Sequence, residues 1–132
     1  MLVDTNVLSE LPRPRPNPNV LRWFDSLETI HLSVVTLEEL AFGVARAPSA
    51  KRPWLARWLD LLLDTRPVVL DVTAAIARAS GELRAAREAR GRRVAQADML
   101  IAATALTHGL TLATRNTRDF EECGVAVIDP FA

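Results

Sequence analysis

Short apolar runs alternate with longer helical segments along this chain, and this alternation restricts the folds that it can adopt. The strand-like runs occupy Met1–Val3, His31–Val35, Val68–Leu70, Leu110–Thr114 and Val125–Ile128. Strands that alternate with helices form a parallel sheet with helices over both faces. We therefore predict an α/β protein with three α/β/α layers and a central parallel sheet of about four to five strands.

Helix signals fill the intervals between these runs. The expected helices lie directly after Asp4 and near residues 20–27, 36–45, 54–63, 74–89 and 95–108, with a short helical turn before the last strand. Gly91 and Gly109 follow two of them, as glycine does at many helix C-termini. Alternating prolines in Leu11–Pro18 predict an extended loop instead. Trp54 and Trp58 are one turn apart and are expected in a core or subunit interface, with stacking on nucleic-acid bases as the alternative.

Bulk properties limit the class of protein. A chain of 132 residues, 49% of them hydrophobic, is expected to form one domain over residues 1–132. No apolar stretch approaches the ~20 residues of a membrane helix, and no secretion signal is apparent. Cys123 is the only cysteine, so no intrachain disulfide can form and a reducing cytoplasm fits best. The formal net charge is zero, so polyanion binding would need local patches.

Polar side chains follow or precede the predicted elements at one edge of the sheet. The carboxyl ends of parallel strands meet at a common rim, where open α/β sheets bind ligands. A helix that returns along the sheet can also begin at this rim. The residues expected there are Asp4, Glu39, Asp98, Asn116 and Asp119.

Each of these residues also has an explanation that needs no ligand. Asp4 is a good helix N-cap. Thr36 and Glu39 have the spacing of a capping box. Asp98 lies in a first helical turn, where the helix dipole favours an acid. Asn116 and Asp119 could form a helix cap of their own, with Asn116 at the N-cap and Asp119 three residues later. These alternatives remain open for each residue taken singly.

Taken together, several carboxylates on one rim repel one another, and a divalent cation relieves that repulsion. Oxygen ligands suit Mg²⁺ or Mn²⁺, and the chemistry that follows is phosphodiester hydrolysis by metal-activated water. The histidines and Cys123 lack the spacing of a zinc site. No phosphate-binding glycine loop of the P-loop or Rossmann kind is present.

Four motifs resemble those of a PIN-domain ribonuclease, and most closely the VapC/FitB-like toxins of type II toxin–antitoxin modules. They are Asp4–Asn6, Ser33–Val44, Ala97–Ala105 and Thr114–Phe120, and the resemblance continues to the tail at Asp129–Phe131. The resemblance implies an endoribonuclease that cuts RNA using Mg²⁺ or Mn²⁺. It also implies a homodimer neutralised by a small antitoxin whose C-terminal segment covers the site.

For the site, the resemblance implies acidic ligands at Asp4, Glu39 and Asp98, with Asp4 and Asp98 as the principal metal ligands. Many family members carry an acid where this chain has Asn116, and here the acid comes three residues later, at Asp119. A second metal position is therefore expected to be weak or absent in the free protein, with Thr114 and Asn116 positioning water or phosphate and Asp119 supporting them from behind. Substrate contacts are expected from Thr5, Asn6, Arg13, Arg15, Arg92, Arg93, Thr114, Arg115 and Arg118.

Three other functions place acids at strand ends. A phosphoacceptor receiver domain needs paired acids near the first strand and a lysine after a late strand, but Lys51 is the only lysine. A haloacid-dehalogenase-like Mg²⁺-dependent phosphatase needs Asp-x-Asp after strand 1, where this chain has Asp4-Thr5-Asn6. A catalytically weak PIN-fold scaffold would not need to keep all three acids.

Overall fold

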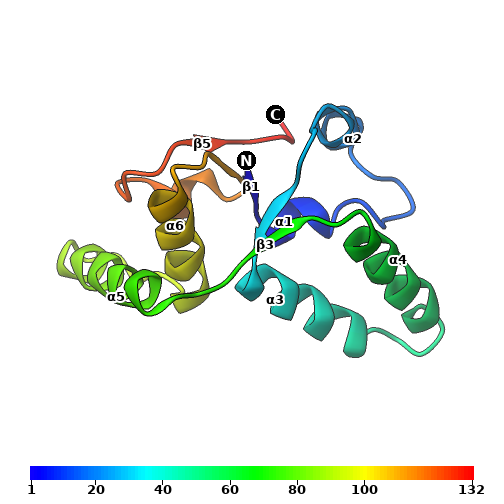
Figure 1. Ribbon diagram of the computed structural model, residues 1–132, viewed down its shortest axis with the longest axis horizontal. Coiled ribbons are helices and arrows are strands. Elements are labelled where there is room, and N and C mark those ends of the chain that lie inside the picture. The colour runs from blue at the N-terminus through cyan, green and yellow to red at the C-terminus, as the bar shows by residue number, and fades with distance from the viewer.

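Five parallel strands form the centre of the structure, a computed structural model that describes residues 1–132 (Figure 1). The strands are β1 (Leu2–Val3), β2 (His31–Ser33), β3 (Val68–Leu70), β4 (Leu112–Ala113) and β5 (Val127–Ile128). Their order in the sheet is β3-β2-β1-β4-β5, and every neighbouring pair is parallel. The predicted parallel sheet is therefore confirmed.

Helices follow the strands in the predicted order. They are α1 (Thr5–Leu8), α2 (Pro18–Asp25), α3 (Val34–Ala45), α4 (Arg52–Asp64), α5 (Ala74–Ala89) and α6 (Gln96–His108), with a 3-10 helix η1 (Thr117–Phe120) before β5. None of them has both the length and the apolar character needed to cross a membrane.

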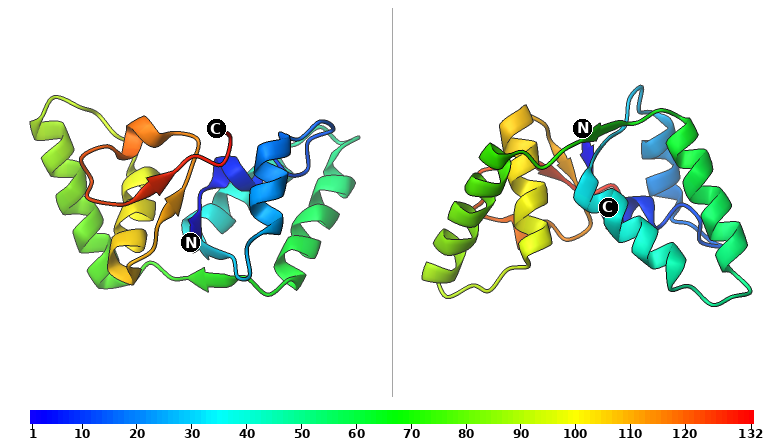
Figure 2. Two further views of the ribbon diagram at one scale, coloured as in Figure 1. Left: turned by 90° about the horizontal axis from the view of Figure 1, so that it is seen from above. Right: turned by 60° about the horizontal axis from the view of Figure 1, so that its bottom comes forward.

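The helices cover the two faces of the sheet as separate layers. Figure 2 shows α5 and α6 on one side and α1 to α4 on the other. Leu2 packs with Met99 of α6 in one hydrophobic cluster, whereas the next residue, Val3, packs with Val7 and Leu32 in a second cluster. Successive strand residues point to opposite faces, so two residues of β1 join both halves of the core. This confirms the three-layer α/β/α arrangement.

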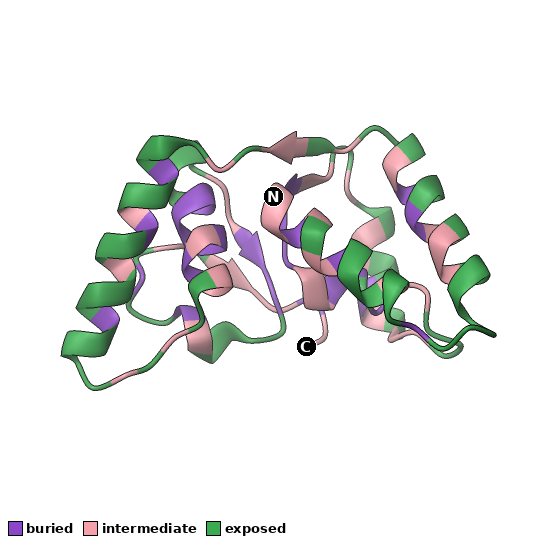
Figure 3. Ribbon diagram, turned by 90° about the horizontal axis from the view of Figure 1, so that it is seen from below, coloured by how far each residue is buried: buried purple, intermediate pink, exposed green.

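Helix α6 is the most deeply buried helix along its length. Buried residues gather on the sheet and on the helix faces turned toward it, while the outer faces are exposed (Figure 3). The run from Ile101 to Ala105 in α6 is entirely buried. The N-terminal turn of α6 must therefore begin beside the sheet, and Asp98 lies in that turn.

The chain changes direction across the sheet between β1 and β4. It adds β2 and β3 on one side of β1 and then returns to place β4 on the other side. Ligands of open α/β sheets bind outside the carboxyl ends of the strands at such a switch point. Residues that follow β1 and β4 therefore occupy the position that this rule assigns to a binding site.

Strand β2 ends earlier than the sequence predicted, because Ser33 rather than Thr36 caps the next helix. The Ser33 hydroxyl accepts a hydrogen bond from the Val35 backbone N–H at 3.0 Å, and α3 begins at Val34. Thr36 is buried inside the helix and its hydroxyl has no partner. The capping box between Thr36 and Glu39 is therefore wrong, and Glu39 lies in the second turn of α3.

The proline-rich segment is an ordered loop with internal contacts. The buried Glu10 carboxylate accepts a hydrogen bond from the Asn17 backbone N–H at 2.9 Å and lies 3.6 Å from Arg13 Nε. Asn17 caps α2 by accepting from the Asn19 N–H at 2.8 Å. Pro18 is the first residue of α2, where its missing N–H costs nothing. The loop between α1 and α2 is thus fixed at both ends.

Two glycines should respond in opposite ways to replacement by alanine. Gly109 ends α6 at φ +63°, so Gly109→Ala is expected to lower the free energy of unfolding by about 1–2 kcal/mol. Gly81 lies inside α5 with no atom near its added Cβ, and Gly81→Ala should raise it by roughly 0.5–1 kcal/mol. Urea unfolding of both variants measures the two changes. Shifts of the same sign would contradict the left-handed assignment at Gly109.

Candidate functional site

Asp4 follows β1 directly and is held by three different donors. Its Oδ1 accepts from the Thr5 backbone N–H at 2.8 Å, which makes Asp4 the N-cap of α1 as one interpretation predicted. Its Oδ2 accepts from the Thr114 hydroxyl at 2.7 Å and from the Asn6 side-chain amide at 3.2 Å. Burial raises the pKa of Asp4, although these hydrogen bonds act in the opposite direction. The cap and a place in a polar site therefore coexist.

Asn6 and Thr114 join the ends of the two central strands. The Asn6 amide also donates to the Thr114 hydroxyl oxygen at 3.2 Å, and Asn6 Oδ1 accepts from the Arg115 backbone N–H at 3.1 Å. Thr114 in turn accepts from the Asn116 N–H at 3.1 Å. These bonds fix the Asp4 carboxylate relative to the segment after β4.

Glu39 reaches the same region from helix α3. Its Oε1 accepts from the Thr5 hydroxyl at 2.7 Å. Glu39 is also among the charges that raise the pKa of Asp4. The side chain of Thr5, directly after Asp4, therefore links the second carboxylate to the first.

Asp98 completes a group of three acids. It is half-buried in the first turn of α6. Burial raises the pKa of Asp98 to about 6, and the charges of Asp4, Asp119 and Glu39 add to this shift. Asp98, expected at the rim where its helix begins, therefore lies close enough to both other acids for their charges to act on it.

These residues line one small polar cavity of about 270 Å³, and no hydrophobic residue contributes to its wall. None of the salt bridges in the protein involves Asp4, Glu39 or Asp98. The lining residues are Asp4, Thr5, Asn6, Ser9, Glu39, Asp98 and Asn116. Three carboxylates thus share a cavity without a cationic side chain to compensate them.

Asn116 and Asp119 occupy different positions. Asn116 lines the acidic cavity, and its side chain makes no capping hydrogen bond to η1, so the suggested cap pair is wrong. Asp119 does not line the cavity and lies 3.7 Å from Arg92 Nη2. Asp119 still acts on the site through its charge, because it helps to raise the pKa of Asp98.

The arginines that the sequence suggested as substrate contacts lie outside the cavity wall. Arg92 donates to the Arg118 backbone carbonyl and pairs with acids of the η1 region. The Arg115 guanidinium stacks 4.7 Å from the centre of the Phe131 ring. Arg15 and Arg93 are exposed. Contacts between these arginines and RNA phosphates therefore remain a prediction, for RNA that extends beyond the cavity wall.

The donor set of the cavity fits a hard divalent cation. No group of three or more acidic, histidine or cysteine side chains could hold an ion unaided. Mg²⁺ needs no such cage, because it keeps several waters and is bound by one or two carboxylates. The uncompensated acids and the amide and hydroxyl oxygens beside them supply suitable ligands.

Ser9 is a cavity residue that the sequence interpretation missed. It is the C-cap of α1 and lies four residues after Thr5, which places both on one side of this short helix. That spacing was the available signal, and it becomes useful only once α1 is known to run along the rim.

Comparison with known proteins places these features in a family. Residues 1–125 match the family described as the PIN domain. The chain is 37% identical to the VapC ribonuclease Y4jK of Sinorhizobium fredii, over 99% of this chain and 97% of that protein. The solved structure of FitAcB from Neisseria gonorrhoeae matches with a TM-score of 0.89 and 39% identity, covering 98% and 97% of the two chains. A toxin–antitoxin complex from Klebsiella pneumoniae matches with a TM-score of 0.76 and 28% identity, covering 98% and 96%.

Proposed function

Because this chain belongs to the PIN-domain family, we propose that it is a metal-dependent endoribonuclease and the toxin of a type II toxin–antitoxin module. The proposal depends on one observation, the cavity in which Asp4, Glu39 and Asp98 meet without a counter-charge from the protein. The similarity to a VapC ribonuclease and to a toxin–antitoxin complex supports it.

Asp4 and Asp98 would hold Mg²⁺ or Mn²⁺ in this proposal, with Glu39 as a third acidic group. When bound, such an ion lowers the pKa of water and stabilises negative charge on a phosphate. The amide of Asn116 adds a neutral oxygen where an acid would add charge, so we expect one strong metal position and a weak second one.

The protein groups around the ion would control positions and protons. Thr114 and Asn6 hold Asp4 Oδ2, so this carboxylate is oriented before any ligand binds. Thr5 occupies Glu39 Oε1 and leaves Oε2 free of hydrogen bonds from the protein. We assign Glu39 Oε2 as the group that accepts a proton from the water that attacks the phosphorus. As the new bond from phosphorus to oxygen forms, the bond to the leaving ribose oxygen breaks, and that oxygen takes a proton from solvent water.

The expected partners follow from the same proposal. They are single-stranded or looped RNA as substrate, a small cognate antitoxin that covers the acidic cavity, and a second copy of the chain in a homodimer. The site of action would be the cytoplasm, where RNA is present and the free, buried Cys123 stays reduced. We propose that residues 1–132 form a single catalytic domain.

The decisive experiment incubates purified protein with defined RNAs and Mg²⁺ or Mn²⁺. Cleavage is expected with either ion, should stop when EDTA removes it, and should return when the ion is restored. Expression in a bacterial host should arrest growth, and co-expression of the cognate antitoxin should relieve the arrest. A protein that binds RNA but cuts none under any of these conditions would instead be a PIN-fold scaffold.

Removing the hydroxyl that orients Asp4 should weaken the reaction without removing a ligand. Thr114→Val is expected to lower the cleavage rate or the Mn²⁺ affinity by roughly 10- to 100-fold. Thr104→Val is the matched control, because it removes another buried hydroxyl, one that donates to the Leu100 carbonyl inside α6. Cleavage assays and calorimetric Mn²⁺ titration compare the two, and equal activities would exclude a positioning role for Thr114.

A further inference from the structure

We propose that the groove between α1, the proline-rich loop and α4 binds the single-stranded RNA that flanks the cleaved phosphate. In this assignment the Trp54 indole stacks on a nucleobase and the Lys51 ammonium contacts a phosphate. The inference rests on the proposed ribonuclease function and adds a substrate-binding surface outside the acidic cavity.

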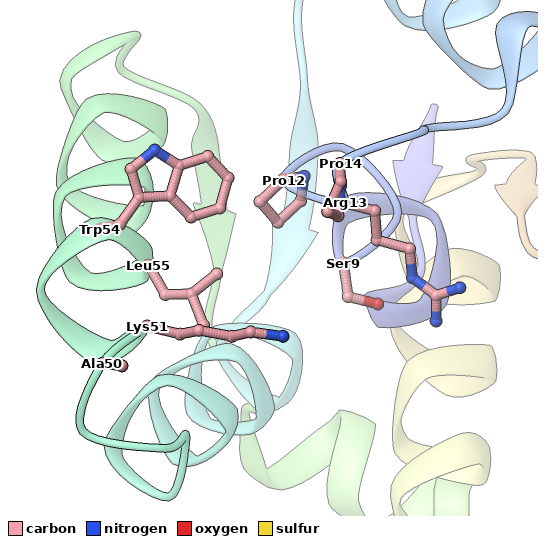
Figure 4. A pocket seen from close by; sticks show the side chains of 8 residues that line it. All are labelled: Ser9, Pro12, Arg13, Pro14, Ala50, Lys51, Trp54 and Leu55. Atoms are coloured by element: carbon pink, nitrogen blue, oxygen red, sulfur yellow. The ribbon is translucent and has the colours of Figure 1, made fainter.

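The groove combines an apolar lining with two basic side chains. Its volume is about 670 Å³, and basic side chains line it without any acidic one. Trp54 remains 57% exposed, so the expectation that it packs into a core is wrong for the single chain. Figure 4 shows the Trp54 indole on the α4 wall and the rings of Pro12 and Pro14 on the loop wall. Lys51 extends from the start of α4 toward α1.

This groove lies next to the acidic cavity. A smaller hollow of about 220 Å³ shares Pro12 and Leu55 with the groove and Thr5 and Glu39 with the acidic cavity. Ser9 lines all three. An RNA strand with one phosphate at the carboxylates would therefore meet the groove within a few residues of Ser9.

The two walls are fixed before any ligand binds. Glu10 ties the loop wall through Asn17 and Arg13. On the other wall, Trp58 packs against the hydrophobic cluster beneath α4 and anchors this helix. Trp54, one turn earlier, stays exposed and lines the groove. An exposed aromatic face beside cationic side chains favours unpaired bases, whose flat faces are accessible for stacking.

The positive charge of Lys51, which no acidic side chain compensates, indicates which kind of molecule occupies the groove. Arg13 has an acidic neighbour in Glu10, whereas Lys51 has no ion-pair partner in the protein. A free cation beside an exposed indole is complementary to a polyanion that carries aromatic bases. We therefore assign RNA as the occupant.

Binding of a 5′-fluorescein-labelled, 12-nucleotide single-stranded RNA in EDTA tests the stacking contact without cleavage. Trp54→Ala is expected to weaken binding by about 5- to 100-fold, while Trp54→Phe should retain most of the affinity. RNA should also quench indole fluorescence in the parent more than in Trp54→Phe. Leu61→Ala is the control, because Leu61 is on the same helix, is 54% exposed and does not line the groove.

A salt titration of the same complex tests the phosphate contact. Lys51→Gln is expected to reduce the slope of log affinity against log salt by about 0.7, the value for one phosphate contact with a single strand. Arg57→Gln removes a charge from an exposed position of α4 outside the groove and should leave the slope unchanged. Either equal slopes for Lys51→Gln and Arg57→Gln or full RNA affinity in Trp54→Ala would overturn the proposal.

Two further outcomes separate this inference from the proposed function. If the parent cleaves RNA and Trp54→Ala binds and cleaves it equally well, the groove assignment fails and the ribonuclease stands. If Trp54→Ala loses affinity for the C-terminal peptide of the cognate antitoxin but not for RNA, the groove docks protein and the inference is also overturned. A parent that binds RNA through Trp54 but never cleaves it would contradict the ribonuclease proposal and leave the RNA surface supported.

Discussion

Asp98→Asn should slow RNA cleavage by roughly 10²- to 10⁴-fold while the protein remains folded. The replacement keeps the size of the side chain and removes one of three negative charges that face the acidic cavity. Asp98 makes no salt bridge, so no protein cation loses its partner. The loss should therefore appear in metal binding and cleavage, measured by Mn²⁺ titration and by single-turnover kinetics.

Asp119→Asn is the matched control for that experiment. Asp119 also acts on Asp98 electrostatically, but its side chain pairs with Arg92 outside the cavity. Loss of such an exposed pair is worth about 1 kcal/mol or less, so cleavage should change by no more than about 5-fold. If Asp119→Asn and Asp98→Asn lose activity equally, Asp119 belongs to the reacting site. If neither loses activity, the metal-site proposal is wrong.

The fold could be predicted from the sequence because the signals for strands, for helices and for helix ends all agreed with one topology. Short apolar runs, long amphipathic segments and the helix-ending glycines at 91 and 109 all fit one alternating pattern. The burial of α6 agrees with the apolar run that follows Asp98 in the sequence. When local signals and topology agree in this way, the fold can be predicted from a single sequence.

The predicted boundary between β2 and α3 was wrong because two local capping signals compete there. Ser33 and Thr36 can each cap a helix, and Thr36 has a glutamate three residues later. The spacing favoured Thr36, but β2 pairs with β3 only as far as Ser33, and the chain turns there into α3. Pairing between strands distant in sequence thus decided the cap, and this information is absent from the local motif.

The candidate site was predictable in its acids and not in its supporting contacts. The carboxylates follow or precede elements that the topology brings to one rim, so Asp4 and Asp98 could be paired before the structure was known. The bond from Thr5 to Glu39 and the linkage of Asn6 with Thr114 depend on side-chain directions that spacing does not determine. The choice of Asn116 over Asp119 as a cavity residue likewise depends on the path of the chain after β4.

The three acids also predict how the metal-free protein responds to pH. The pKa of Asp98 lies near 6 in the folded protein and near 3.8 in an unfolded chain. Between these values the folded state holds the proton more tightly, so stability falls as pH rises through this window. Below it, Asp98 is protonated in both states, and above it the cost of the buried charge is fully present. The shift corresponds to about 3 kcal/mol at most, and solvent screening of a half-buried group reduces this to roughly 1–2 kcal/mol.

Asp98→Asn should therefore stabilise the metal-free protein by roughly 1–2 kcal/mol at pH 7.5 and by much less at pH 4. Urea unfolding in EDTA at both pH values measures the difference between parent and variant. Asp71→Asn, at an exposed position, should show no such pH-dependent gain. Saturating Mn²⁺ should reverse the order at pH 7.5, because the ion binds the folded parent and compensates its acids. If Asp98→Asn is no more stable than the parent without metal, Asp98 does not carry the repulsion among the acids. If Mn²⁺ stabilises the variant as much as the parent, Asp98 does not hold the ion.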